Sequence, residues 1–312
     1  MRWLKDLFAE GRELLCREYP DARERDSLLN ALLEDVLHFP RYASLTDPFR
    51  EVDERDCDIF LSCARRLAGG EPLQYIVGWA EFCGRRFNVS PSVLIPRPET
   101  EQLCMEAVER IRRTFPGLRG VSSEGHGIDG GHPEEGVRPL RILDLCTGSG
   151  CIAWTLALSL PGCEAIGVDI SPAALQVALN QDLLPAGDRS GALAPKFVEY
   201  DVLRGPSGFD FGEFDVIISN PPYVTESERP LMRRNVLEHE PSLALFVPDT
   251  DALRFYRAVL GWADRLLVPG GLLFFEQNEA YSAQIATICA HLSEVEISDD
   301  CFGKPRFTFA RK

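Results

Sequence analysis

The sequence has few of the features that mark membrane-bound proteins or proteins that coat nucleic acids. No apolar stretch approaches the roughly 20 residues needed to cross a bilayer, and the N-terminal segment is broken by charges and lacks the apolar core of a signal peptide. Lys and Arg total 33 against 48 Asp and Glu, a formal net charge of −15. Because nucleic-acid affinity comes largely from basic side chains that displace counterions, this balance excludes a general nucleic-acid coat protein. We expect a cytoplasmic protein without membrane association.

Metal ligands are also scarce. The chain has five histidines, none at the spacing of a metal site, and its ten cysteines include no C-x-x-C pair. With no export signal, free thiols are expected rather than disulfides. We predict no metal site, and this holds for His126 and His132 as well.

A length of 312 residues favours two domains. Residues 1–71 predict a small helical-bundle domain, because apolar side chains recur at helical spacing in three segments. Residues 72–100 carry β-branched and aromatic side chains among Gly and Pro, which favours a β-hairpin linker. Residues 101–312 predict an α/β domain that contains a flexible Gly-rich loop at 114–139, a stretch without hydrophobic periodicity.

Within this last domain, strands alternate with helices from residue 140 onward. Such alternation predicts a doubly wound, mostly parallel sheet with helices on both faces. The last two strands have no clear helix between them, so we expect an antiparallel pair at one edge. The expected strands are RILDL, EAIGVDI, KFVEY, FDVIISN, GLLFFEQ, EVEIS and PRFTFAR.

The segment RILDLCTGSGC predicts a strand, a tight glycine turn and the start of a helix. Gly148 and Gly150 allow the backbone to turn sharply and a ligand to approach it closely. The next strand ends in Asp169, 21 residues after Gly148, and a carboxylate there can accept hydrogen bonds from two ribose hydroxyls. Asp144, at the end of the first strand, would repel a pyrophosphate and suits a cation.

This pattern favours S-adenosylmethionine, which carries a sulfonium and an ammonium but no phosphate. A nicotinamide dinucleotide is the first alternative, because Ala153 occupies the third position of G-x-G-x-x-G and that motif tolerates alanine. A glycine turn that merely packs is the second alternative.

The strand FDVIISN runs directly into Asn220-Pro221-Pro222-Tyr223. Ligands of open α/β sheets bind at the carboxyl ends of the strands, so this tetrapeptide should face the cofactor. The Asn220 side-chain oxygen and the Pro221 carbonyl can each accept a hydrogen bond from a planar NH2 group, and Tyr223 can pack against that group. Two acceptors favour a pyramidal nitrogen and stabilise the positive charge that develops on it during methyl transfer.

The motifs DLCTGSG, GVDIS and SNPPYV together resemble the class I, Rossmann-like methyltransferases that use S-adenosylmethionine. The N-terminal helices and the segments EPLQYIVGWAEFCGRRFNVSPSVLIPRPETE and EHEPSLALF narrow the resemblance to the protein-(glutamine-N5) methyltransferases that modify peptide chain release factors. The resemblance covers nearly the whole chain. One departure is Cys146, which stands where the family usually has glycine and restricts the backbone beside the cofactor.

The resemblance implies a substrate, a partner and a site. The substrate is the glutamine of the Gly-Gly-Gln motif, which is methylated on its side-chain amide. The release factors that carry this motif act in translation termination. The partners are the release factors, with the helical domain recognising them, and we expect a monomer without stable nucleic-acid binding. Catalysis is assigned to Asn220, Pro221 and Tyr223, and substrate binding to these three and Pro222. Cofactor binding is assigned to Cys146, Thr147, Gly148, Ser149, Gly150, Asp169, Asp201, Val202 and Asn220.

Three alternatives remain open at this point. A glutamine of a ribosomal protein would undergo the same chemistry. An adenine-N6 methyltransferase of DNA or RNA would present a similar NH2 group, but residues 1–71 carry 16 acidic against 11 basic side chains, a net of −5, which suits a DNA clamp poorly. A cofactor-binding protein without catalysis would have no need for two aligned acceptors.

Overall fold

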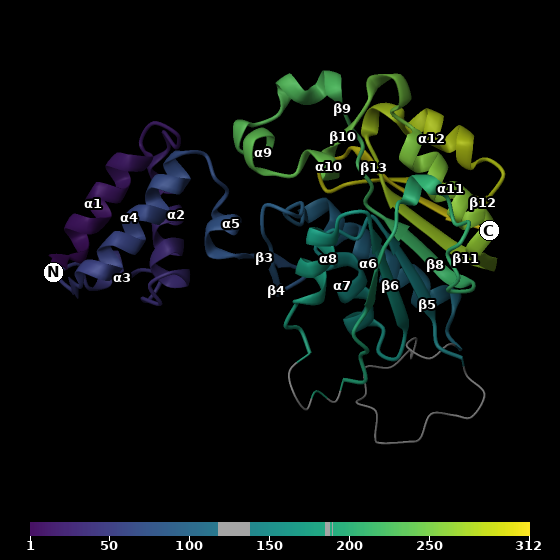
Figure 1. Ribbon diagram of the computed structural model, residues 1–312, viewed down its shortest axis with the longest axis horizontal. Helices are drawn as coiled ribbons and strands as arrows, with labels where there is room; N and C mark the ends of the chain where they lie inside the picture. Colours follow the sequence, from purple (N-terminus) through teal and green to yellow (C-terminus); the bar gives the residue numbers. More distant parts are fainter. Residues whose placement is uncertain (118–137, 185–187, 189) are drawn as a thin grey trace. The chain divides into compact units, whose positions relative to one another are not determined.

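A computed structural model describes residues 1–117, 138–184, 188 and 190–312 (Figure 1). Most of the predicted loop at 114–139, with His126 and His132, lies outside the described residues. The ten cysteines all lie within them and are free thiols, as expected. No helix in the described ranges is long and apolar enough to cross a membrane. The chain divides into two compact units, one of residues 1–79 with 231–240 and one of residues 80–230 with 241–312.

The first unit is helical, as predicted. Amphipathic helices bury one leucine-rich face each in a common core that includes Leu7, Leu33 and Phe60. Asp21 and Asp53 cap the second and fourth helices by accepting hydrogen bonds from backbone N–H groups of the first turn. The elements are β1 (Arg2–Trp3), α1 (Leu4–Leu15), α2 (Ala22–Asp35), α3 (Ala43–Thr46), β2 (Glu51–Val52), α4 (Glu54–Ala68), α5 (Leu73–Val77) and, from far along the chain, α9 (Arg234–His239).

The predicted hairpin over 72–100 is only partly correct. Strands β3 (Trp79–Phe82) and β4 (Arg85–Asn88) form the two-stranded sheet, but Leu73–Val77 is the short helix α5. Pro72 precedes this helix, and Gly78 ends it in a left-handed conformation with φ 84°. Start and stop signals therefore override the β-branched character of the residues between them. The domain boundaries at residues 71 and 100 stay predictions.

The second unit is built on a seven-stranded sheet in the order β12-β13-β11-β8-β5-β6-β7 (Figure 1). The strands from β11 to β7 are parallel, and β13 runs antiparallel to both of its neighbours. This confirms the predicted fold class and the antiparallel edge. The strands are β5 (Arg141–Leu145), β6 (Glu164–Asp169), β7 (Lys196–Glu199), β8 (Phe214–Ser219), β11 (Leu267–Glu276), β12 (Ser293–Asp299) and β13 (Pro305–Arg311).

Helices cover both faces of the sheet. Successive side chains of a strand point to opposite faces, so in β8 Val216 and Ile218 contact one apolar cluster and Ile217 contacts the other. The first cluster includes side chains of α6 (Pro98–Thr114) and α7 (Cys151–Ser159), and the second those of α11 (Arg254–Leu266) and α12 (Ser282–Cys289). The described residues of this unit also form α8 (Pro172–Leu179), β9 (Val224–Thr225), α10 (Ser242–Leu245), β10 (Phe246–Val247) and short 3-10 helices.

The strand register aligns the carboxyl ends of four neighbouring strands. Leu145 of β5 pairs with Val168 of β6 and with Ser219 of β8, which in turn pairs with Phe275 of β11. The residues that follow these four therefore form one row across the sheet, namely Cys146, Asp169, Asn220 and Glu276. The strand order reverses between β5 and β8, and in open α/β sheets this is where ligands bind.

The close approach of β6 to the glycine turn can be tested at Gly167. A Cβ atom there would lie 2.6 Å from Thr147 Oγ1 and 2.7 Å from Phe197, so we expect Gly167→Ala to destabilise the protein by about 1–3 kcal/mol. The matched control is Gly261→Ala in α11, where a Cβ would meet nothing within 4 Å and should stabilise the helix by about 0.5–1 kcal/mol. Urea unfolding measures both, and a Gly167→Ala variant as stable as the unmodified protein would contradict the close packing.

Candidate functional site

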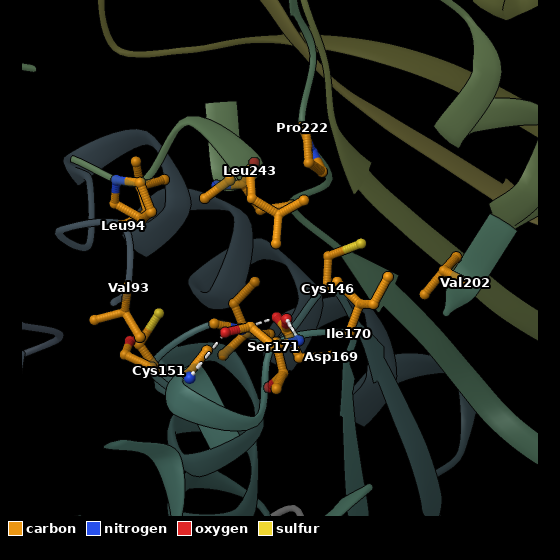
Figure 2. Close-up of a pocket in the computed structure, with 18 of the residues that line it drawn as sticks. Val93, Leu94, Cys146, Cys151, Asp169, Ile170, Ser171, Val202, Pro222 and Leu243 are labelled. Atoms are coloured by element: carbon orange, nitrogen blue, oxygen red, sulfur yellow. Dashed lines mark hydrogen bonds between the residues drawn. The ribbon is translucent and has the colours of Figure 1, made fainter. Parts of the chain in front are cut away.

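A cavity opens at the carboxyl ends of β5, β6 and β8 (Figure 2). Cys146, Asp169 and Pro222 come from the strand ends, while Val93 and Leu94 approach from the segment before α6. Its lining consists of Ser92, Val93, Leu94, Pro96, Arg97, Thr100, Cys146, Thr147, Gly148, Ser149, Cys151, Ile152, Asp169, Ile170, Ser171, Ala174, Asp201, Val202, Leu203, Asn220, Pro222, Pro241, Leu243, Ala244 and Phe255.

The turn after β5 has the backbone conformation that its glycines were expected to allow. Gly148 and Gly150 have φ of 55° and 78°, in the left-handed region. A Cβ at Gly148 would meet nothing within 4 Å, whereas one at Gly150 would lie 2.9 Å from Phe197. Gly148 thus leaves space beside the cavity, and Gly150 permits close packing of the turn on its support. Cys146 shares the left-handed conformation, with φ 62°, in spite of its side chain.

Asp144 lies beneath this turn and does not line the cavity. Its carboxylate is fully buried and accepts hydrogen bonds from Thr147 Oγ1 at 2.6 Å and from the backbone N–H of Ala153 at 3.2 Å, both on Oδ2. Oδ1 is buried and accepts no hydrogen bond from the described residues. Burial is the main cause that raises the pKa of Asp144 to about 7. The side chain that the sequence suggested as a partner for a cation therefore lies behind the turn and has no direct access to the cavity.

The Asp169 carboxylate lines the cavity and also supports the turn. Oδ2 accepts a hydrogen bond from the N–H of Gly148, and Oδ1 accepts one from the N–H of Ser171, both at 2.9 Å. A carboxylate has about four acceptor positions, so lone pairs remain for ligand hydroxyls. Burial raises its pKa, and the backbone hydrogen bonds oppose this shift. Asp201 and Val202 line the cavity too, and the N–H of Leu203 donates to the Asp201 carboxylate.

Asn220 is linked to a chain of buried polar side chains. Its Nδ2 donates to Thr100 Oγ1 at 3.0 Å, and the Thr100 hydroxyl donates to Glu276 Oε2 at 2.7 Å. The other carboxylate oxygen of Glu276 accepts a hydrogen bond from the hydroxyl of Tyr223, also at 2.7 Å. Thr100 and Glu276 are 2% and 1% exposed. Burial is the main cause that raises the pKa of Glu276 and that of Tyr223.

The structure brings together most of the residues assigned from the sequence, and it leaves three outside the lining. Gly150 packs away from the cavity, Pro221 is buried, and the Tyr223 hydroxyl is bonded to Glu276, so none of these lines it. Their roles, and those of the other site residues, stay predictions. Sequence reasoning missed Thr100 and Glu276. The PRPETE block contains the first, and the second immediately follows the buried run LLFF, but no spacing connects them.

The cavity suits a ligand that combines cationic groups with a ribose. Asp169 and Asp201 belong to its lining, and behind the turn Asp144 has an oxygen to which no described residue donates. Ile170 and Val202 add apolar surface to the lining, and Figure 2 shows Ile170 beside Asp169. S-adenosylmethionine has an ammonium, a sulfonium, two ribose hydroxyls and an apolar adenine face, and the lining residues fit these groups.

Comparisons with known proteins give consistent results for both parts of the chain. Residues 6–78 match the PrmC N-terminal domain, and residues 138–304 match a methyltransferase domain. A release factor glutamine methyltransferase of Bacteroides thetaiotaomicron is 42% identical over 250 residues, which cover 79% of this chain and 78% of the relative. One of Bradyrhizobium diazoefficiens is 33% identical over 308 residues, covering 97% and 94%. A solved T. thermophilus 16S rRNA N2 G1207 methyltransferase has a TM-score of 0.45 at 20% identity, over 75% of this chain and 49% of that chain.

The buried Asp144 predicts an unusual pH dependence of stability. Its folded-state pKa of about 7 lies above the unfolded value near 3.9, so its contribution to stability is complete below about pH 4 and is lost as the pH rises through 7. Asp144→Asn can keep both hydrogen bonds on its oxygen and carries no charge. Relative to the unmodified protein, we expect it to gain on the order of 1–3 kcal/mol of stability between pH 5 and pH 8.

Urea unfolding of both proteins at pH 5 and pH 8, without ligand, measures this gain. Groups away from this site titrate equally in the two proteins, so the difference between them reports Asp144 together with its electrostatic coupling to Asp169. A difference that does not change with pH would show that Asp144 is ionised without cost.

Proposed function

The chain belongs to the release factor glutamine methyltransferases, and on that basis we propose that it methylates the side-chain amide nitrogen of the glutamine in the Gly-Gly-Gln motif of peptide chain release factors. The methyl donor is S-adenosylmethionine. The observation that carries the proposal is the position of Asn220, which lines the cavity one strand away from the turn of Cys146 to Gly150. The group that can hold an amide nitrogen thus lies beside the group that fits the donor.

The register of β5 and β8 fixes this neighbourhood. Leu145 and Ser219 are paired residues, and the Ser219 hydroxyl also donates to the Leu145 carbonyl at 2.6 Å. The next residues, Cys146 and Asn220, leave the sheet side by side. A substrate nitrogen held at Asn220 is therefore kept close to a donor held at the turn, and such positioning supplies a large part of a transfer reaction's acceleration.

The chemistry required of the protein is to make an amide nitrogen nucleophilic. Its lone pair is delocalised into the carbonyl, so the free amide reacts poorly. S-adenosylmethionine supplies an electrophilic methyl group on its sulfonium. We assign to Asn220 Oδ1 and the Pro221 carbonyl the two hydrogen bonds that hold the NH2 group, favour a pyramidal nitrogen and stabilise the charge developing on it. Such contacts strengthen toward the transition state, so they lower the barrier.

A glutamine that follows two glycines suits the mouth of this cavity. Leu94 and Leu243 belong to its lining (Figure 2), and Leu243 is 59% exposed. Two residues without side chains allow the substrate backbone to pass such apolar groups without steric conflict. We also propose the cytoplasm as the place of reaction, because translation factors act there, and the protein as a monomer in solution.

The proposal is tested by methyl transfer from labelled S-adenosylmethionine to a purified release factor. We expect label on the unmodified factor and none on its Gly-Gly-Gln→Gly-Gly-Ala variant, because the variant lacks the amide. Label on both factors would show that another residue is the acceptor. A ribosomal-protein mixture and double-stranded DNA serve as competing substrates, and preferential labelling of either would move the activity to that class.

Two substitutions separate the roles of the cavity's two sides. Asn220→Ala removes an acceptor for the substrate amide, so we expect kcat to fall on the order of 10²–10³-fold while the Kd of S-adenosylmethionine changes only a few-fold. Asp169→Ala removes the predicted ribose acceptor and a support of Gly148, so we expect it chiefly to raise that Kd. Calorimetric titration and steady-state kinetics measure the two effects. Asn220→Ala with undiminished kcat would refute the acceptor role.

A further inference from the structure

The amide of Asn220 has two ends of nearly equal size and opposite hydrogen-bonding character. Only Oδ1 can accept a hydrogen bond from a substrate NH2 group, while Nδ2 can only donate. Rotation by 180° exchanges the two ends at little steric cost. The useful orientation therefore has to be fixed by hydrogen bonds from neighbouring groups.

Those neighbours are Thr100 and Glu276. A threonine hydroxyl has one proton, and Thr100 donates it to Glu276 Oε2 at 2.7 Å. Its oxygen is then left only as an acceptor toward Asn220, so the group that meets it at 3.0 Å must be Nδ2. Because the two atoms branch from one carbon, Nδ2 on Thr100 directs Oδ1 to the other side.

We propose that Thr100 and the carboxylate of Glu276 are positioning residues that orient the Asn220 amide, so that its oxygen and not its nitrogen faces the substrate. The proposal deepens the proposed function and rests on it. Thr100 is 2% exposed and Glu276 1%, so bulk water does not compete for these hydrogen bonds.

The hydrogen bonds that connect Glu276, Thr100 and Asn220 form a chain that we call the relay. Its direction depends on the charge of Glu276. The ionised carboxylate is acceptor-only, and it also receives the Tyr223 hydroxyl on Oε1 at 2.7 Å. A protonated Glu276 can donate to Thr100, whose own proton then turns to Asn220 and requires Oδ1 there. In that reversed relay Asn220 Nδ2 faces the substrate. Its N–H groups then meet the NH2 group of the substrate amide, and neither can accept a hydrogen bond from the other.

Charged and titratable groups around Glu276 come from several elements. Arg306 of β13 lowers its pKa, and Glu99 of α6 raises it. Tyr223, after β8, and Tyr256 of α11 also interact electrostatically with Glu276. Burial is the largest cause and leaves the pKa of Glu276 raised. The active orientation therefore requires a pH above this raised pKa, and kcat falls as the pH drops through it.

Three variants and one combination test the relay. Glu276→Gln keeps the shape but can present either its amide oxygen or its amide nitrogen to Thr100, since the Tyr223 hydroxyl can pair with the other end, so the relay loses its fixed direction and we expect kcat to fall several-fold. Thr100→Val removes the relay and leaves Asn220 able to adopt either orientation, so the loss should be only several-fold. Thr100→Ser retains the hydroxyl and should restore kcat to within about threefold of the unmodified enzyme.

The decisive measurement is the double variant Thr100→Val/Glu276→Gln. Without the threonine hydroxyl the side chain at position 276 no longer affects the orientation of Asn220, so we expect the double variant to be no slower than Thr100→Val alone. Losses that add in free energy would overturn the relay, because independent structural damage is additive. Unmodified kcat in Glu276→Gln would overturn it as well.

Two further readouts separate positioning from folding. The Kd of S-adenosylmethionine should stay close to the unmodified value in Thr100→Val and Thr100→Ser. The melting temperature should stay close to it in Thr100→Ser and fall in Thr100→Val, which leaves a buried Glu276 oxygen without its donor. The acid limb of kcat should be present in the unmodified enzyme and absent from Thr100→Val, a comparison that does not need a folded Glu276 variant. An unchanged acid limb in Thr100→Val would overturn the proposal.

Activity of the unmodified enzyme distinguishes a failure of the proposed function from a failure of the relay. If this enzyme transfers no methyl group to the release factor, the proposed function fails and the relay fails with it. If it labels the factor while the double variant behaves additively, only the relay fails.

Discussion

The site depends on the register between neighbouring strands of the central sheet, that is, on which residues pair across it. Hydrogen bonds between parallel strands pair Leu145 with Ser219 and Ser219 with Phe275. A shift by one residue in β8 would turn every one of its side chains to the opposite face and would separate Asn220 from the glycine turn. The apolar clusters on both faces therefore stabilise the fold and also fix the strand register, which keeps Asn220 next to the glycine turn.

Three acidic side chains lie close together at the carboxyl edge of the sheet, and their burial is compensated to different degrees. Asp169 is relieved by backbone N–H groups on both oxygens. Glu276 receives two hydroxyls and lies in the field of Arg306. Asp144 has two donors on one oxygen and, among the described residues, none on the other, so it is the least compensated of the three. Local instability of this kind is common where a site must complement the charge of a ligand.

Sequence patterns predicted the architecture because each of its signals is local. Strand alternation, the glycine turn and the tetrapeptide at Asn220 are all read from adjacent residues. Helix α5 was misread because its capping residues, Pro72 and Gly78, outweigh its β-branched composition. The contact between Thr100 and Glu276 spans 176 positions, so only the three-dimensional structure connects them. The same applies to Tyr223, whose hydroxyl is bonded to Glu276 instead of lining the cavity.

Cys146 places a sulfur atom in the lining of a cavity that fits an alkylating agent. Thiols react with methyl sulfonium compounds as thiolates, and the neutral thiol is a poor nucleophile. Burial, together with the nearby carboxylates of Asp169 and Asp144, raises the pKa of Cys146 well above its usual range. The acids that attract the donor's charge thus also keep this thiol protonated. A protonated Cys146 is a poor nucleophile toward a methyl sulfonium held in the same cavity.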